Sequence, residues 1–285
     1  MIAANRGTLF WLSAFLAFGL PAAQALADTR LIAHYAISMT GVSVGQLTWT
    51  IDVATVTGVY RASANGKASG PLSVLVNGEG RVAARGTLVD GQPTPGIFTS
   101  NVTEDGETTG LQMTFENGSV KTLRSDAALR KNDGKEGRVP VTEADMRGVT
   151  DPLSGMTIAA PAGDLLAAQN CDRVVAIFDG QRRYNLALSF KRVDKLKIER
   201  GYAGPVLVCA VMLRPIAGHR ADSMLVKYVS GQRGMEIWFA PIASTDLAAP
   251  ARLVMPTIIG TLEIDADRFE TAATGEPGGG SPPKP

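Results

Sequence analysis

A regular alternation of apolar and other side chains is the feature that most limits how this chain can fold. Residues 31–39, 47–53 and 184–190 carry an apolar side chain at every second position. Successive side chains of a strand point to opposite faces, so this period indicates strands with one buried face. The run "VLVCAVML" at 206–213 is apolar throughout and predicts a strand that is covered on both faces.

Turn signals divide these segments into many short strands. Gly and Pro number 31 and 16, and they are spread along the chain. Asn77-Gly78, Asp90-Gly91, "FENGSV" at 115–120 and "FDGQ" at 178–181 are typical of tight hairpins, in which positive φ is needed. We therefore predict a mainly β fold, a curved antiparallel sheet that forms a barrel-like or half-barrel structure.

The middle of the chain departs from this pattern. Thr142-Glu143-Ala144-Asp145 resembles a capping box, and Asp151 followed by Pro152 suits the start of another short helix. We expect short helices within residues 142–169, plugging or flanking the sheet, and no convincing helix elsewhere.

Both ends of the chain have a distinct composition. Residues 1–27 combine Arg6, the apolar run "TLFWLSAFLAFGL" and the small residues Ala25-Leu26-Ala27, which predicts a signal peptide cleaved after Ala27 and export to the periplasm. The apolar run is short for a bilayer, so no transmembrane span is expected after signal removal. Residues 28–270 then form a single β-rich domain. Residues 271–285 lack large apolar side chains and are expected to be a disordered tail rich in Gly and Pro.

The segment Gly41-Val42-Ser43-Val44-Gly45 matches the G-x-S-x-G pattern of serine hydrolases. That motif needs a helix after the serine, whereas "QLTWTID" alternates like a strand. His34 and His219 are the only histidines available for a triad. We interpret the segment as a hairpin, and a hydrolase that uses Ser43 stays a minor alternative.

Composition argues against several other classes of function. A net charge of +1 and a pI near 7.8 disfavour a nucleic-acid surface. Two histidines and two distant cysteines do not form a metal-ligand cluster, and no phosphate-binding or dinucleotide-binding motif is present. We therefore expect no metal, no cofactor, no nucleic-acid partner and no catalytic residue.

Cys171 and Cys209 are the only two cysteines. In an exported protein such a pair usually forms a disulfide, so a structural cross-link is the favoured interpretation. Two buried free thiols, or a redox-active couple, are the alternatives; the second is disfavoured because the residues are far apart in sequence.

Four residues are candidates for ligand binding: Trp49, Arg182, Arg183 and Tyr184. The two arginines follow a turn in a locally basic hairpin, and guanidinium groups suit phosphate or carboxylate. They equally suit a solvated sheet face whose charges protect an edge strand. Trp49 could line a cavity in a curved sheet or simply fill the core.

Several segments together resemble a known family. They are "HYAISMTGVSVGQLTWTI", "DPLSGM", "CDRVVAIFDGQRRYNLAL" and "GPVLVCAVMLRPIAGHR". They are similar to the exported bacterial proteins grouped as domain of unknown function 3108. The resemblance implies an envelope-associated β-rich domain without an established activity, and it supplies no catalytic residues.

The leading hypothesis is a non-catalytic periplasmic protein that binds a hydrophobic or amphipathic ligand, such as a lipid, or an envelope protein. The alternative is a structural or assembly factor of the cell envelope that acts through its surface.

Overall fold

The computed structural model describes residues 28–69, 78–104, 106–126, 137–160 and 163–274. The predicted signal peptide at 1–27 lies outside these residues, as does Asn77 of the predicted Asn77-Gly78 turn.

The N-terminal half is an antiparallel meander in which each strand pairs with the next one along the chain. Its strands are β1 (Asp28–Met39), β2 (Val42–Ala54), β3 (Val59–Ala68), β4 (Gly78–Val89), β5 (Gln92–Glu104), β6 (Glu107–Glu116) and β7 (Ser119–Ser125).

The C-terminal half combines further strands with short helical segments. The strands are β8 (Ile158–Ala159), β9 (Arg173–Phe178), β10 (Arg183–Lys197), β11 (Arg200–Gly201), β12 (Ala203–Ala217), β13 (Glu236–Pro241), β14 (Leu247–Thr257) and β15 (Gly260–Thr274). The helical segments are η2 (Glu143–Met146), α2 (Pro152–Gly155), η3 (Ala168–Asn170) and α3 (Met224–Gly231).

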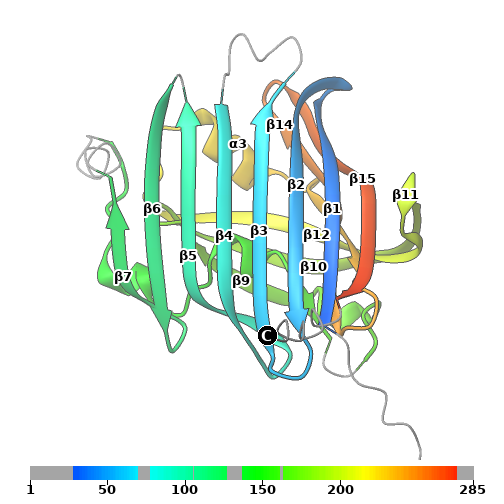
Figure 1. Ribbon diagram of the computed structural model, residues 1–285. Coiled ribbons are helices and arrows are strands. Elements are labelled where there is room, and N and C mark those ends of the chain that lie inside the picture. Colours follow the sequence, from blue (N-terminus) through cyan, green and yellow to red (C-terminus); the bar gives the residue numbers. More distant parts are fainter. Residues whose placement is uncertain (1–27, 70–77, 105, 127–136, 161–162, 275–285) are drawn as a thin grey trace, which may run out of the picture.

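All of these strands belong to one sheet. Its order is β7-β6-β5-β4-β3-β2-β1-β15-β14-β13-β12-β10-β9, with β8 beside β14 and β11 beside β15. Strands β1 to β6 stand side by side in Figure 1, and β10 and β12 cross behind them. The outermost described strands, β7 and β9, do not pair with each other, so the sheet is an open half-barrel. The predicted mainly β, curved antiparallel fold is confirmed.

The space between the two halves is filled by a main hydrophobic core. Leu31, Ile51 and Tyr60 of the front strands belong to the same buried cluster as Val206 and Val208 of β12. Burying each large apolar side chain contributes roughly 1.5–3 kcal/mol. Helix α2 contacts β3, β4, β5 and β9, and therefore helps to fill this interior.

A second cluster covers the opposite face of β12. Leu207, Cys209 and Val211 pack there with Val229 of α3. β12 is therefore buried on both faces, as its continuous apolar sequence predicts.

Three of the hairpin turns have the expected backbone conformation. Thr40-Gly41, Asp90-Gly91 and Asn117-Gly118 have φ values of 49° and 80°, 50° and 78°, and 52° and 68°. Positive φ at both central residues is what type I′ hairpin turns require. The first of these turns confirms that the segment around Ser43 is part of a hairpin, but the turn itself is Thr40-Gly41, and Val42 to Gly45 already belong to β2.

The two predicted helix starts are also confirmed. Asp145 Oδ2 accepts hydrogen bonds from the Thr142 backbone N (2.8 Å) and Oγ1 (2.7 Å), which completes the capping box of η2. Asp151 Oδ1 accepts from the backbone N of Leu153 (2.8 Å) and Ser154 (3.0 Å) at the start of α2. Each helical segment that begins between residues 142 and 169 has at most four residues.

Two details differ from the sequence-based expectation. Helix α3 was not predicted, because Val226 and Val229 are β-branched and surrounded by strand-like sequence; its one signal is Ser223, whose Oγ accepts from the Val226 N (3.3 Å). In addition, β15 continues through Thr274, four residues into the predicted tail, because pairing with Asp28 to Leu31 of β1 provides backbone hydrogen bonds that composition does not reveal.

The predicted disulfide is confirmed. Cys171 and Cys209 are bonded, with their Cα atoms 5.5 Å apart, and both are fully buried in the second cluster. The bond connects the end of η3 to the middle of β12, across a sequence separation of 38 residues.

We expect removal of the disulfide to destabilise the protein. A closed loop of this length contributes about 4 kcal/mol through the entropy of the unfolded chain. Cys171→Ala/Cys209→Ala should lower the free energy of unfolding, measured with guanidinium chloride, by roughly that amount. Reductant should destabilise the wild type and leave the double variant unchanged; equal stability of both proteins without reductant would contradict this expectation.

Candidate functional site

The sheet opens at one end because β13 is short. β13 pairs with β12 only from Leu207 to Ala210, and its last backbone contact there is the hydrogen bond from Val211 N to Met235 O (3.0 Å). Beyond this point β12 continues to Ala217 beside β10 alone, and β14 continues to Thr257 beside β15 alone. The two strands leave an opening between them.

Helix α3 lies against both β12 and β14 at this opening. Together they enclose a groove of about 740 Å³, a size typical of small-molecule sites. We refer to it as the α3 groove. Its apolar lining consists of Met39, Tyr184, Leu213, Pro215, Ala217, Leu225, Val226, Val229, Met255, Ile258, Ile259 and Leu262.

Basic residues gather among the polar residues that line the groove. The charged ones are Arg138, Asp179, Arg182, Arg183 and Arg220, and His219, Ser223 and Thr257 are also present. An apolar wall with a few convergent polar groups is the usual form of a ligand pocket.

Two of these arginines already have a carboxylate partner. Arg182 Nη1 lies 4.0 Å from Asp179 Oδ2, and Asp179 also accepts from the Arg182 backbone N. Arg220 Nη2 lies 2.9 Å from Asp222 Oδ2. The Arg220–Asp222 pair is largely exposed and the Arg182–Asp179 pair is partly exposed, so both contribute little to stability.

Arg138 and Arg183 have neutral partners instead. Arg138 Nη1 donates to the Gly218 carbonyl (2.6 Å), and Arg183 Nη1 donates to the Tyr184 carbonyl (2.7 Å). Within the described part of the chain, no carboxylate oxygen lies within 4 Å of either guanidinium. Burial lowers the pKa of Arg183, which reflects the cost of holding this cation away from water. Both cations retain capacity for an anionic group.

The imidazole of His219 adds an unused polar atom. Its Nδ1 is buried and has no hydrogen-bond partner among the described residues. The adjacent backbone is fixed, because Val139 N donates to the His219 carbonyl (2.9 Å). A buried polar atom without a partner is costly.

The structure brings together three of the four predicted ligand-binding residues. Arg182, Arg183 and Tyr184 line the α3 groove, and burial raises the pKa of Tyr184, so its hydroxyl stays neutral. Trp49 is separate: it is 5% exposed and belongs to the main core. Alternation places Trp49 on the inner face of β2, and alternation alone does not distinguish a packed core from a cavity. The role of Trp49, Arg182, Arg183 and Tyr184 in ligand binding stays a prediction.

The sequence analysis missed the other half of the groove. Leu225 and Val226 belong to the unpredicted helix, and Ile258 and Ile259 form the turn between β14 and β15. A possible signal is the turn itself, since two isoleucines occupy positions that usually carry Gly, Asn or Asp.

Ser43 does not have the surroundings of a nucleophile. It lies in β2, opposite Ser38 of β1, and a strand follows it in place of a helix. In the region that the structure covers, no hydrogen bond connects Ser43 with His34 or His219.

A second hollow of about 560 Å³ lies on β9, β10 and β12. Its lining mixes apolar residues with Asp172, Arg173, Arg214 and Arg233. It is smaller than the α3 groove, and none of the four predicted residues lines it.

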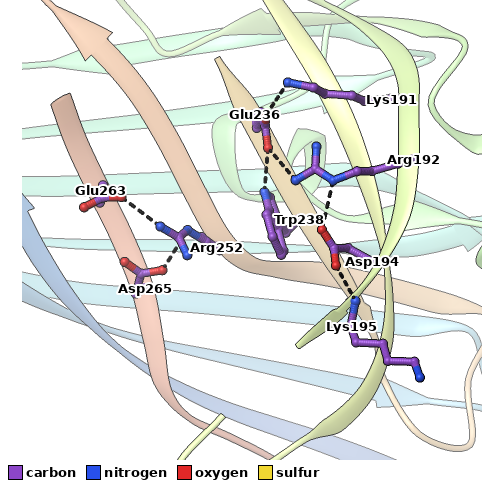
Figure 2. Close-up of polar contacts among 9 residues, drawn as sticks. All are labelled: Lys191, Arg192, Asp194, Lys195, Glu236, Trp238, Arg252, Glu263 and Asp265. Atoms are coloured by element: carbon purple, nitrogen blue, oxygen red, sulfur yellow. Dashed lines mark hydrogen bonds and ion pairs between the residues drawn. The ribbon is translucent and has the colours of Figure 1, made fainter. Parts of the chain in front are cut away.

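A polar network surrounds Trp238 on the neighbouring strands (Figure 2). The guanidinium carbons of Arg192 and Arg252 lie 5.0 and 5.4 Å from the centroid of its ring. Glu236 accepts from Trp238 Nε1 (2.9 Å), from Arg192 Nη2 (3.3 Å) and from Lys191 Nζ.

Charges within this network balance. Arg252 forms ion pairs with Glu263 (2.8 Å) and Asp265 (3.1 Å), as Figure 2 shows. Burial raises the pKa of Asp265, and Arg252 opposes that shift. Every cation at its centre already has a carboxylate partner, so the network connects strands and offers no unpaired charge to a ligand.

We expect Arg252→Gln to lower the free energy of unfolding by roughly 1–2 kcal/mol, because two carboxylates lose this cation and the Trp238 ring keeps only Arg192. Denaturant titration at low and high salt measures this effect, which should be larger at low salt. Arg30→Gln is the matched control, since Arg30 forms a single exposed pair with Asp52. A loss no larger than that of the control would contradict a structural role for the network.

A buried carboxyl lies in the interior, apart from the groove. Asp151 is 0% exposed, and its Oδ2 has no hydrogen-bond partner among the described residues. Burial raises its pKa above the ordinary 3.8, although the backbone N–H groups of Leu153 and Ser154 oppose the shift.

This pKa shift predicts a pH-dependent stability. Below pH 3.8 the carboxyl is protonated in both the folded and unfolded states. As the pH rises, ionisation favours the unfolded state, so the wild type should lose stability relative to Asp151→Asn until the pH exceeds the folded-state pKa. Urea titrations over a pH series measure the difference. Asp164→Asn is the control, because that exposed carboxylate also accepts a backbone N–H; a flat difference for Asp151→Asn would contradict the assignment.

Across the described ranges, no group of three or more His, Cys, Asp or Glu residues is arranged to hold a metal ion. None of the described helices is long and apolar enough to cross a membrane.

Comparison with known proteins gives one match by sequence. A family model described as "Protein of unknown function (DUF3108)" matches residues 34–267, a range that includes every residue of the α3 groove. No curated protein matches the chain.

Solved structures that are similar to this chain include two crystal structures. One is a β-barrel-like protein of domain of unknown function DUF1849 from Brucella abortus, with 10% identity, a TM-score of 0.49, and coverage of 87% of this chain and 98% of that chain. The other is described as a "putative lipoprotein" from Parabacteroides distasonis ATCC 8503, with 10% identity, a TM-score of 0.33, and coverage of 86% and 95%.

Proposed function

The chain belongs to the DUF3108 family, and we propose that it is a non-catalytic protein of the cell envelope that binds an amphipathic, anionic ligand in the α3 groove. A fatty acid or a lipid with an acidic headgroup is the class of ligand that this site suits.

One observation carries the proposal: an apolar groove is lined by two arginines, Arg138 and Arg183, that have no carboxylate within ion-pair distance among the described residues. Burying a hydrocarbon chain against Leu213, Val226 and Met255 would contribute roughly 0.8 kcal/mol per CH₂. Arg138 and Arg183 could each donate to a carboxylate or phosphate oxygen.

Location in the envelope is supported by the disulfide and by the predicted signal peptide. Disulfides persist in oxidising compartments such as the periplasm and are rare in the cytosol. The pairing of Cys171 with Cys209 therefore fits export.

The absence of a reactive arrangement among the groove residues supports a binding role. Ser223 and His219 both line the groove, but Ser223 Oγ accepts from the Val226 N and caps α3. No hydrogen bond joins that hydroxyl to His219 among the described residues. A nucleophile would need such a base within reach.

Binding of a fluorescent fatty acid and of its methyl ester tests the proposal. The two probes share their hydrocarbon chain, so only the acid can use the guanidinium groups. We expect the acid to bind at least tenfold more tightly, which corresponds to roughly 1.4 kcal/mol. Native mass spectrometry of the purified protein should in addition reveal co-purified acidic lipid. If neither probe binds, the proposal fails and the surface-acting assembly factor becomes the better hypothesis.

Filling the groove should prevent binding. Leu213→Trp adds volume to a wall of the cavity, and we expect it to weaken binding of both probes at least tenfold. The melting temperature of the variant verifies that it folds. Leu123→Trp on β7 is the control, because Leu123 is an exposed leucine outside the groove. Equal probe affinity in the wild type and in Leu213→Trp would exclude the α3 groove as the site.

A further inference from the structure

We propose that the mouth of the α3 groove docks onto an anionic phospholipid bilayer, from which the groove takes up or delivers its ligand. This inference rests on the proposed function, because it assigns the source of the ligand.

Large apolar side chains project from the segments that surround the mouth. Ile258 and Ile259, at the tip of the β14–β15 hairpin, are 50% and 74% exposed. Met224 and Leu225, in the first turn of α3, are 75% and 49% exposed, and Val42 at the start of β2 is 47% exposed. We refer to these five residues as the docking edge.

The docking edge is continuous with the groove. Ile258, Ile259 and Leu225 also line the cavity, and the neighbouring β1–β2 hairpin is joined to β15 by the hydrogen bond from Thr40 N to Thr261 O (2.8 Å). Figure 1 shows α3 and the tips of these hairpins at the same end of the molecule. An exposed apolar cluster beside a cavity marks an interaction surface.

Charge next to the docking edge complements anionic headgroups. Four arginines and one aspartate line the groove, and the side chains of Arg182 and Arg220 are 54% and 61% exposed. Asp179 and Asp222 pair with Arg182 and Arg220. Among the described residues, Arg138 and Arg183 have no carboxylate within ion-pair distance, and Asp145 acts on Arg183 only from farther away. Juxtamembrane cations attract anionic lipid surfaces, and apolar side chains that enter the interface add binding.

This geometry favours a bilayer, rather than the surrounding solution, as the source of the ligand. An acyl chain could pass from the membrane over the isoleucines into the groove without crossing water, which avoids the cost of exposing its hydrocarbon. A water-soluble ligand would need no apolar residues at the rim.

Flotation of the full mature chain with lipid vesicles tests the inference. We expect it to bind vesicles of phosphatidylcholine with phosphatidylglycerol, to bind pure phosphatidylcholine vesicles at least tenfold more weakly, and to be released as salt rises. No vesicle binding, or equal binding to the two compositions, would overturn it. Release by soluble glycerol phosphate would assign binding to the headgroup alone and would also overturn it.

Two paired variants locate the surface. Ile258→Ser/Ile259→Ser should reduce vesicle binding at least tenfold. Val42→Ser/Met224→Ser changes two exposed residues that do not line the groove, and should reduce vesicle binding while leaving soluble fatty-acid binding within about threefold of the wild type. Val56→Ser is the matched control, since Val56 is 76% exposed in the turn at the opposite end of β2.

The results separate this inference from the proposed function. Leu213→Trp should lose probe binding and retain vesicle binding, whereas Val42→Ser/Met224→Ser, whose two residues lie outside the groove, should show the reverse. Wild-type-like vesicle binding by both docking-edge variants, or an equal loss in Val56→Ser, would overturn the docking surface even if the groove binds fatty acid. Analytical ultracentrifugation checks for self-association. If the wild type forms a concentration-dependent dimer and Ile258→Ser/Ile259→Ser does not, the docking edge is a dimer interface and the membrane-docking inference is overturned.

Discussion

The pairing of β1 with β15 is the constraint on which the rest of the structure depends. The meander from β1 to β7 and the strands from β9 to β14 lie on opposite sides of this pair in the sheet order. Its register extends from Asp28 opposite Thr274 to Met39 opposite Leu262, with one irregularity between His34 and Tyr35. A slip by one residue would turn the inward side chains of a strand outward, so this ladder determines which faces of the two halves form the main core.

The α3 groove follows from a difference in strand length within that sheet. β12 has 15 residues and β14 has 11, but β13 between them has 6. The long strands cannot close the gap that β13 leaves, and α3 lies over the opening with Val229 in the second cluster. A cavity arises here because a helix and two diverging strands cannot pack as closely as paired strands do.

Local patterns predicted much of this architecture. Alternation, the Asp90-Gly91 and Asn117-Gly118 turns, the caps at Thr142 and Asp151, and the apolar run in β12 all express short-range rules that this chain obeys. Alternation also predicted which face of its strand carries Tyr184, but it did not predict whether that face packs into the core or lines a groove.

What the sequence did not reveal depends on long-range contacts. The last residues of β15 are stabilised by pairing with β1, more than 230 positions earlier in the chain. Trp49 and Tyr184 occupy similar positions in alternating strands, yet one faces the packed core and the other faces the groove. Only the tertiary arrangement of β12, β14 and α3 distinguishes them.

The α3 groove lies directly beside the second hydrophobic cluster. Cys209 and Leu213 lie on the same face of β12, four residues apart, and the disulfide connects Cys209 to Cys171 within the second cluster. The disulfide thus ties η3 to a fully buried segment of β12 that lies next to the wall of the groove. The mouth of the groove, unlike this buried segment, is exposed to solvent. Its isoleucines and Met224 are exposed, and its arginines are only partly compensated by carboxylates. Covering these exposed apolar side chains by a partner would gain free energy, and this is the physical basis of the proposed interaction.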